Sequence, residues 1–134
     1  GKFTSLYSGK MNAKSLIGKG KFSMVYKVAR KKNKKEVFAA KVVTKKKLTE
    51  RELEMTKNEA AIVQLVGWHE HIGKLVDYFV QKKVNIFVFE MVSGGELFDE
   101  IVARGTISEE EIGLWIEQLL SALATCHDRF NVVH

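Results

Sequence analysis

The stretch SLIGKGKFSMVYKV, residues 15–28, places Gly18 and Gly20 one residue apart and directly before β-branched and aromatic residues. Three kinds of nucleotide-binding loop have glycines at such spacing. The phosphate loop of nucleotide hydrolases needs Ser or Thr after a Gly-Lys pair, which is missing here. The dinucleotide fingerprint needs a helix after the glycines, whereas MVYKV favours a strand. Two interpretations remain: a hairpin that covers phosphates with its backbone N–H groups, and a plain glycine turn between strands.

Lys41 strengthens the phosphate-binding interpretation. It is the only charged residue in VFAAKVV, residues 37–43, whose apolar composition predicts a strand. Burial of an unpaired ammonium group is costly, so a lysine at this position favours a charged partner or ligand. Strand alternation places it on the same face as Ala39, whose small side chain leaves room for a flat base beside a phosphate. The alternative is a lysine on an edge strand that reaches solvent.

Glu59 is the expected partner of Lys41. A capping box formed by Thr49 and Glu52 predicts the start of a helix that contains Glu59. Helical spacing predicts that Glu59 shares one apolar stripe with Met55, Ile62, Val63 and Val66. A carboxylate within such a stripe favours a buried cation, and Lys41 is the nearest unexplained cation upstream. The alternative is a glutamate at the edge of the stripe that reaches water.

The order of the predicted elements indicates an α+β fold. Strands are expected at residues 22–30, 36–43, 73–80 and 84–92, with the long helix between the second and the third. A short helix closed by Gly105 follows, and then a longer one that starts at a capping box of Ser108 and Glu111. Strands first and helices last suggest an α+β lobe joined to the start of a helical one.

Composition limits the class of protein. The 134 residues are 46% hydrophobic and 28% charged, which is typical of a soluble globular domain. No apolar run approaches the ~20 residues of a membrane span, and the N-terminus lacks the apolar core of a signal peptide. The one cysteine, Cys126, excludes an internal disulfide and suits a reducing compartment. We therefore expect no membrane span and a cytoplasmic location.

Charge is distributed unevenly along the chain. Residues 1–50 contain 15 Lys and Arg against 2 Asp and Glu, whereas residues 51–134 contain 7 against 14. The lysines of the basic half gather at residues 30–35 and 45–47, between patterned segments, and no aromatic residues interleave with them. Such runs are typical of solvated turns, so we expect no nucleic-acid binding.

Several motifs together resemble the eukaryotic protein kinase domain. IGKGKFSMV resembles the Gly-rich loop of that family, and FAAK resembles its lysine strand. NEAAIVQL is similar to the helix that carries the paired glutamate, and FVFEMVSGGELFDEIV to the hinge and the helix after it. VVH resembles the start of the catalytic loop. The likeness runs from about residue 7 to residue 134, and GGELFDEIVARG is most similar to the calcium/calmodulin-dependent serine/threonine kinases.

The resemblance implies a fold and its division. It implies an antiparallel five-stranded sheet with one helix, the N-lobe and helix C of the family, followed by the first helices of an α-helical C-lobe. Residues 1–9 would be an N-terminal flank, residues 10–92 an ATP-binding N-lobe, and residues 93–134 the hinge exit and an incomplete C-lobe.

The resemblance also implies roles in binding ATP. Lys41, paired with Glu59, would hold the α- and β-phosphates, and Val25 and Ala39 would sandwich the adenine below Ile17. The backbone that covers the phosphates would be that of the loop residues Gly18, Gly20, Lys21, Phe22 and Ser23.

Further roles fall on the hinge and on a hydrophobic spine. Phe89 would be the gatekeeper, and the backbone of Glu90 and Val92 would bond the adenine edge. Glu96 would face the ribose and, in relatives that prefer basic substrates, a substrate arginine. Because Ser93-Gly94-Gly95-Glu96 also satisfies a capping box, the start of a helix is an alternative role for Glu96. The spine of the family would include Val63, Leu75 and His134.

The expected function is transfer of the γ-phosphoryl group of ATP to Ser or Thr hydroxyls of protein substrates, with ATP and Mg²⁺ as cofactors. The catalytic Asp, the Asn and the Asp-Phe-Gly metal ligands of the family follow the His that His134 matches. No metal ligand is therefore expected within this chain, and the chain alone is expected to be inactive. The alternative is a pseudokinase that acts as a scaffold or regulatory module. An "RD" after His134 and a later "DFG" would favour the enzyme.

Overall fold

The computed structural model of the chain describes residues 2–133. They form two compact units. The first unit comprises the residues up to 65 together with 74–91, and the second comprises residues 66–73 together with those from 92 onward. Each unit is described by itself below. No helix among the described residues is both long enough and apolar enough to cross a membrane.

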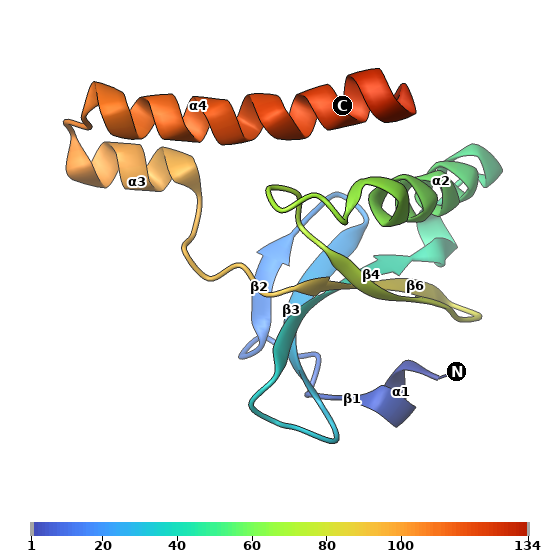
Figure 1. The fold of residues 1–134 in the computed structure, drawn as a ribbon. Helices are drawn as coiled ribbons and strands as arrows, with labels where there is room; N and C mark the ends of the chain where they lie inside the picture. The colour runs from blue at the N-terminus through green and yellow to red at the C-terminus, as the bar shows by residue number, and fades with distance from the viewer. Residues whose placement is uncertain (1, 134) are drawn as a thin grey trace. The chain divides into compact units, whose positions relative to one another are not determined.

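The first unit is built on one antiparallel sheet (Figure 1). The strands are β1 (Tyr7–Ser8), β2 (Leu16–Lys19), β3 (Ser23–Arg30), β4 (Val37–Thr44), β5 (Leu75–Val80) and β6 (Val84–Glu90). Their order is β1-β3-β4-β6-β5, and β2 also pairs with β3. The predicted α+β architecture is confirmed. The sheet has six strands instead of five, because Tyr7 and Ser8 pair with Arg30 and Ala29.

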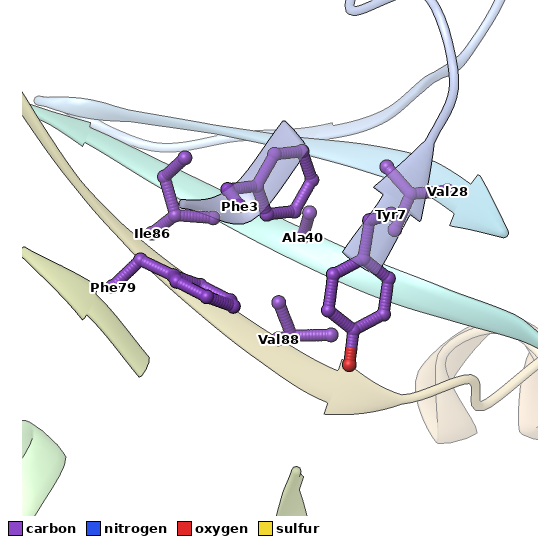
Figure 2. Close-up of a cluster of buried hydrophobic side chains, with 7 residues drawn as sticks. All are labelled: Phe3, Tyr7, Val28, Ala40, Phe79, Ile86 and Val88. Carbon is purple, nitrogen blue, oxygen red and sulfur yellow. The ribbon is translucent and has the colours of Figure 1, made fainter. Parts of the chain in front are cut away.

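The sheet has a buried face on each side. The N-terminal face is covered by α1 (Phe3–Leu6) and β1, whose Phe3 and Tyr7 stack on each other with ring centroids 5.3 Å apart. Figure 2 shows the core on this face, which consists of Phe3, Tyr7, Val28, Ala40, Phe79, Ile86 and Val88. The helix-side face is covered by α2 (Glu50–Val66) and buries Val43, Ala60, Leu75 and Phe87. Alternate residues of β4 and β6 thus serve opposite cores.

Helix α2 begins where its capping signal predicts. The Thr49 backbone N–H donates to a Glu52 carboxylate oxygen at 2.8 Å, and the Glu52 N–H donates to the Thr49 hydroxyl at 3.3 Å. The capping box therefore satisfies two N–H groups that the helix leaves unpaired. A short 3₁₀ turn, η1 (Lys45–Lys47), connects β4 to this start.

The predicted apolar stripe of α2 is wrong at two positions. Met55 and Ile62 are 61% and 39% exposed, whereas Thr56 and Ala60 are buried. The face that packs on the sheet is thus rotated by about one residue from the predicted one. Of the two small buried residues, Ala60 packs in the helix-side core, whereas the long Met55 side chain points out of it. Glu59 lies beside Ala60 at the edge of this buried face.

The second unit is helical, with α3 (Leu97–Arg104), α4 (Glu109–Ala124) and a π-helical turn, η2 (Thr125–Arg129). Gly105 closes α3 as predicted, with φ of 69° and its N–H bonded to the Ile101 carbonyl. Gly fits this position because side chains disfavour positive φ.

Of the two capping boxes predicted in the second unit, one forms in part and the other does not form. Ser108 caps α4 by accepting a hydrogen bond from the Glu111 N–H, but the Glu111 carboxylate binds Arg104 through two 2.6 Å hydrogen bonds. The box predicted from Ser93 to Glu96 is absent, since Glu96 is the N-cap of α3 and makes no side-chain cap. The helix-capping alternative for the Glu96 carboxylate is therefore wrong.

Candidate functional site

The candidate site of the first unit centres on Lys41 in β4. Its ammonium group lies 2.5 Å from Glu59 Oε1, so the strand and α2 are joined by an ion pair. The two side chains keep 28% and 41% of their surface exposed. Lys41 also lies over the Phe87 ring, with Nζ 5.4 Å from the centroid, an arrangement that attracts a cation to the ring face. Lys41 is therefore anchored on two sides and still reaches solvent.

Pairing across the strands places Lys41 in a defined row. In the register of the sheet, Gly18 lies opposite Val25, Val25 opposite Lys41, and Lys41 opposite Phe87. Residues directly opposite in an antiparallel sheet point to the same face. The structure thus brings Gly18, Val25, Lys41 and Glu59 together on the helix-side face, although they come from four elements.

A second row lies beside the first. Ala39 pairs with Phe89 across β4 and β6, two residues from the Lys41–Phe87 pair, so both rows share one face. The rings of Phe87 and Phe89 stack with centroids 6.2 Å apart. Next to Lys41 the sheet therefore presents one small side chain and one flat aromatic ring.

The glycine stretch forms a hairpin, and no helix follows it. β2 pairs with β3, and the Gly20 N–H donates to the Ser23 carbonyl at 2.8 Å, which closes a four-residue turn. A β-carbon at Gly20 would lie only 2.6 Å from Ser23 Oγ, so a side chain there would meet this hydroxyl. The Thr44 N–H donates to the Phe22 carbonyl at 3.1 Å and ties the turn to the end of β4.

The other loop residues predicted for the site lie on or beside this hairpin. Ile17 is 51% exposed in β2. The Lys21 ammonium lies 4.7 Å from the centroid of the Phe22 ring at the turn. These two residues thus contact each other at the tip of the hairpin.

Only part of the predicted hinge falls in the first unit. The Glu90 N–H donates to the Lys74 carbonyl at 3.0 Å, so this N–H is not free to bind a ligand. Of the Glu90 backbone groups predicted to bond the adenine edge, the carbonyl remains. Val92 and Glu96 belong to the second unit and are described only there. Val92 is 73% exposed, and Glu96 precedes α3.

Three of the residues predicted for the hydrophobic spine and gatekeeper gather in one core. Leu75 is buried in the helix-side core, and Val63 and Phe89 pack against it. His134 lies outside the described residues.

Sequence reasoning missed two polar residues in the same core. Tyr78 packs against Phe87 with centroids 4.7 Å apart, and Asn85 is 2% exposed. Burial, and next the charge of Glu59, raise the pKa of Tyr78. The sequence carries no signal for this, because a tyrosine in an alternating strand is read as an ordinary core residue.

The described residues show no group of three or more His, Cys, Asp or Glu side chains placed to hold a metal ion. The site consists instead of one cation, its carboxylate partner, a glycine hairpin and an apolar surface. Such a set can bind an anionic ligand that carries a flat apolar group.

The chain is similar in sequence to known proteins. Residues 11–134 match the protein kinase domain family. The chain is 38% identical over 128 residues to calcium/calmodulin-dependent protein kinase type II of Caenorhabditis briggsae, covering 96% of this chain and 24% of that protein. Identity to the type II alpha chain of Drosophila melanogaster is also 38%, with the same coverage. Type 1 of Caenorhabditis elegans is 35% identical over 125 residues, covering 93% of this chain and 35% of that protein.

The chain spans about a quarter of the length of the type II relatives. The family match covers nearly all of its residues and includes both the glycine hairpin and the Lys41–Glu59 pair. The chain belongs to the protein kinase domain family.

Proposed function

We propose that the chain supplies the ATP-binding part of a protein serine/threonine kinase, which transfers the γ-phosphoryl group of ATP to Ser or Thr hydroxyls of proteins. The observation that carries this proposal is the 2.5 Å ion pair between Lys41 and Glu59 on the same sheet face as Gly18 and Val25. Family membership supports the reaction class, and the resemblance of GGELFDEIVARG to the calcium/calmodulin-dependent serine/threonine kinases supports serine/threonine specificity.

Lys41 is the residue proposed to hold the phosphates. An ammonium group has three N–H donors, and a single contact to Glu59 leaves donors for the α- and β-phosphates. Glu59 keeps the ammonium on its face, since the pair joins α2 to β4. Positive charge held in place before the substrate binds stabilises phosphate groups at little reorganisation cost.

The surroundings of Lys41 fit the rest of the nucleotide. Val25 and Ala39 are proposed to contact the adenine with Ile17, and Phe89 to border it as gatekeeper. The Glu90 carbonyl and the Val92 backbone are proposed to bond the adenine edge, and Glu96 to face the ribose or a substrate arginine. The hairpin residues from Gly18 to Ser23 are proposed to cover the phosphates.

Magnesium chemistry is assigned to no described residue, because the metal ligands of the family follow the His that His134 matches. We propose that the acceptor Asp and the metal ligands come from residues beyond these 134, so that this chain alone would be inactive. The proposed division is an N-lobe at residues 10–92 with residues 93–134 beginning the C-lobe. A cytoplasmic location and protein substrates complete the proposal.

The test is Lys41→Met in the longer protein that contains this chain, measured as phosphate transfer from ATP to a protein or peptide. Loss of one preorganised charge should lower kcat at least ~100-fold. Lys35→Met is the matched control, because Lys35 is an exposed lysine in the β3–β4 turn, and it should leave turnover unchanged. Unchanged turnover in Lys41→Met would refute the role of Lys41. No turnover in the unmutated protein would favour a pseudokinase.

A further inference from the structure

Residues Phe3–Ser8, here called the strap, form α1 and β1 and lie outside the residues that match the kinase family. The two aromatic side chains of the strap are buried in the core of the N-terminal face. The Lys31 N–H donates to the Leu6 carbonyl at 2.8 Å, and Tyr7 pairs with Arg30. Both backbone bonds and side chains therefore hold the strap on the sheet.

Tyr7 connects strands that are not neighbours in the sheet. The Tyr7 backbone pairs with Arg30 at the end of β3, and its hydroxyl donates to the Asp77 carboxylate in β5. In the strand order β3-β4-β6-β5, the strands β4 and β6 lie between these two ends. Ala40 of β4 and Val88 of β6 belong to the same buried cluster as Tyr7 (Figure 2). This connection, the brace, thus lies over β4 and β6 on the face opposite the candidate site.

The residues under the brace lie between the two rows of the candidate site. The register of β4 and β6 contains three successive pairs, Ala39–Phe89, Ala40–Val88 and Lys41–Phe87. The outer two pairs face α2 and the middle pair faces the strap, because successive residues of a strand point to opposite faces. A backbone shift of the middle pair therefore moves both outer pairs, since each is only one peptide unit away.

A bulge in β5 turns Asp77 toward the strap. The pairing of β5 with β6 shifts by one residue between Leu75 and Asp77. In a regular strand these two residues would share a face, whereas Leu75 lies in the helix-side core and Asp77 binds Tyr7 on the other face. Bulges often re-aim a side chain next to a functional site, and this one supplies the acceptor of the brace.

We propose that the Tyr7–Asp77 bond positions the candidate site from the opposite face of the sheet. By holding β4 and β6 against each other, the brace fixes the place of the Phe89 ring relative to Ala39. Tyr7 and Asp77 are thus positioning residues that do not touch the ligand. Their effect on ATP binding rests on the proposed function, whereas their effect on Phe89 and Ala39 does not.

The methyl group of Ala39 tests the brace without any nucleotide. Ala39 lies directly opposite Phe89, so the chemical shift of its methyl group depends on the place of that ring. In the longer protein that contains this chain, labelled with ¹³C at alanine methyl groups, Tyr7→Phe should move the Ala39 resonance. Asp77→Ala breaks the same bond from the other side and should move it in the same direction. An Ala39 resonance that both variants leave in place would overturn the proposal.

Val84→Ala is the matched control for a loss of stability on the same face. Val84 packs against the same buried cluster, but it is the first residue of β6 and lies at the far end of that strand from Phe89. The variant should destabilise the protein and leave the Ala39 resonance in place. A shift of Ala39 as large as that in Tyr7→Phe would mean that any loss of packing moves the site, which would overturn the role of the brace.

Kinetics of the same variants test the effect on ATP. Contacts to the adenine contribute equally to substrate and transition state, so Tyr7→Phe should raise KM for ATP about fivefold and change kcat less than about twofold. A merely structural role would lower the folded fraction and hence kcat at constant KM, and Val84→Ala should leave KM unchanged. An unchanged KM in Tyr7→Phe would overturn the positioning role. A longer protein with no turnover before mutation would contradict the proposed function alone, because the Ala39 resonance still decides the brace.

Discussion

The hydroxyl of Tyr7 donates a hydrogen bond to the carboxylate of Asp77, although the two residues are 70 positions apart in the sequence. This bond joins β1 to β5 across the N-terminal face of the sheet. Arg30 lies over the Tyr7 ring, with its guanidinium carbon 5.5 Å from the centroid, and adds a cation–π contact. Phe3 and Tyr7 are therefore part of the core of the first unit.

Tyr7→Phe should destabilise the chain by ~1–3 kcal/mol, because the Asp77 carboxylate loses its donor. The free energy of unfolding from urea titration at neutral pH measures this. Ser8→Ala is a suitable control, since Ser8 is the neighbouring residue and makes only a long 3.4 Å bond to the Ala29 carbonyl. An effect of Tyr7→Phe no larger than that of Ser8→Ala would show that the Asp77 bond contributes little.

The same bond predicts a dependence on alkaline pH. Burial, the hydrogen bond to Asp77 and its charge raise the pKa of Tyr7 above its usual value. A raised pKa means that the folded state keeps a proton that the unfolded state loses above pH ~10, so unfolding becomes more favourable as pH rises past that value. The difference in stability between the parent chain and Tyr7→Phe should therefore shrink above pH ~10. A difference that stays constant in that range would contradict the prediction.

Arg104 and Glu111 predict a dependence on acidic pH in the second unit. The bidentate contact from Arg104 lowers the pKa of Glu111. A lowered pKa gives stability that is present above the unfolded value of 4.5 and is lost as pH falls below it. Glu111→Gln should lower the melting temperature at pH 7 and have less effect at strongly acidic pH. The neighbouring Glu110→Gln, which lacks this contact, should show no such change with pH.

Gly20 and Ser23 should behave as a coupled pair. Gly20→Ala forces Ser23 Oγ out of its position and should cost ~1 kcal/mol of stability, and Ser23→Gly should remove most of that cost. Gly18→Ala is the matched control, since its β-carbon would meet Val25 at 3.5 Å, an ordinary contact. Urea unfolding of the single and double variants provides the measurement. Equal costs for Gly20→Ala with and without Ser23 would contradict the coupling.

Helix α4 should make the isolated chain bind dyes that report exposed apolar surface. Leu114, Ile116, Leu119 and Leu120 are 52%, 49%, 57% and 58% exposed. Large exposed apolar patches favour association, so we expect low solubility and dye fluorescence that falls when Leu119 and Leu120 are replaced by lysine. A monodisperse chain with no dye signal would contradict this.

The contact between Lys41 and Glu59 was predictable because each of them is a charged residue within an apolar segment. A single charge in an apolar strand and another in a helical stripe both need partners, which limits the possible pairs. The rotation of α2 was not predictable to one residue. It depends on the packing of the small residue Ala60 in the helix-side core, and the hydrophobic pattern does not encode that fit.

The three predicted capping boxes show that the same local sequence pattern does not always form the same hydrogen bonds. The same Ser/Thr-x-x-Glu spacing forms fully at Thr49, in part at Ser108 and not at Ser93. Arg104 competes for the Glu111 carboxylate in the second case. Between Ser93 and Glu96 stand two glycines, and Gly95 adopts a φ of 81°, which lies outside the helical region. Strand β1 was likewise missed, since two residues are too few to show alternation.

The alternation in β4 has a consequence for the evolution of the chain. Ala40 is buried in the core of the N-terminal face, while Lys41 faces α2. Deletion or insertion of one residue within β4 would exchange the two, placing an ammonium group in the N-terminal core and an alanine opposite Glu59. Homologous sequences should therefore vary in length within the β3–β4 turn, where Lys31 to Lys35 are exposed, and keep β4 at constant length.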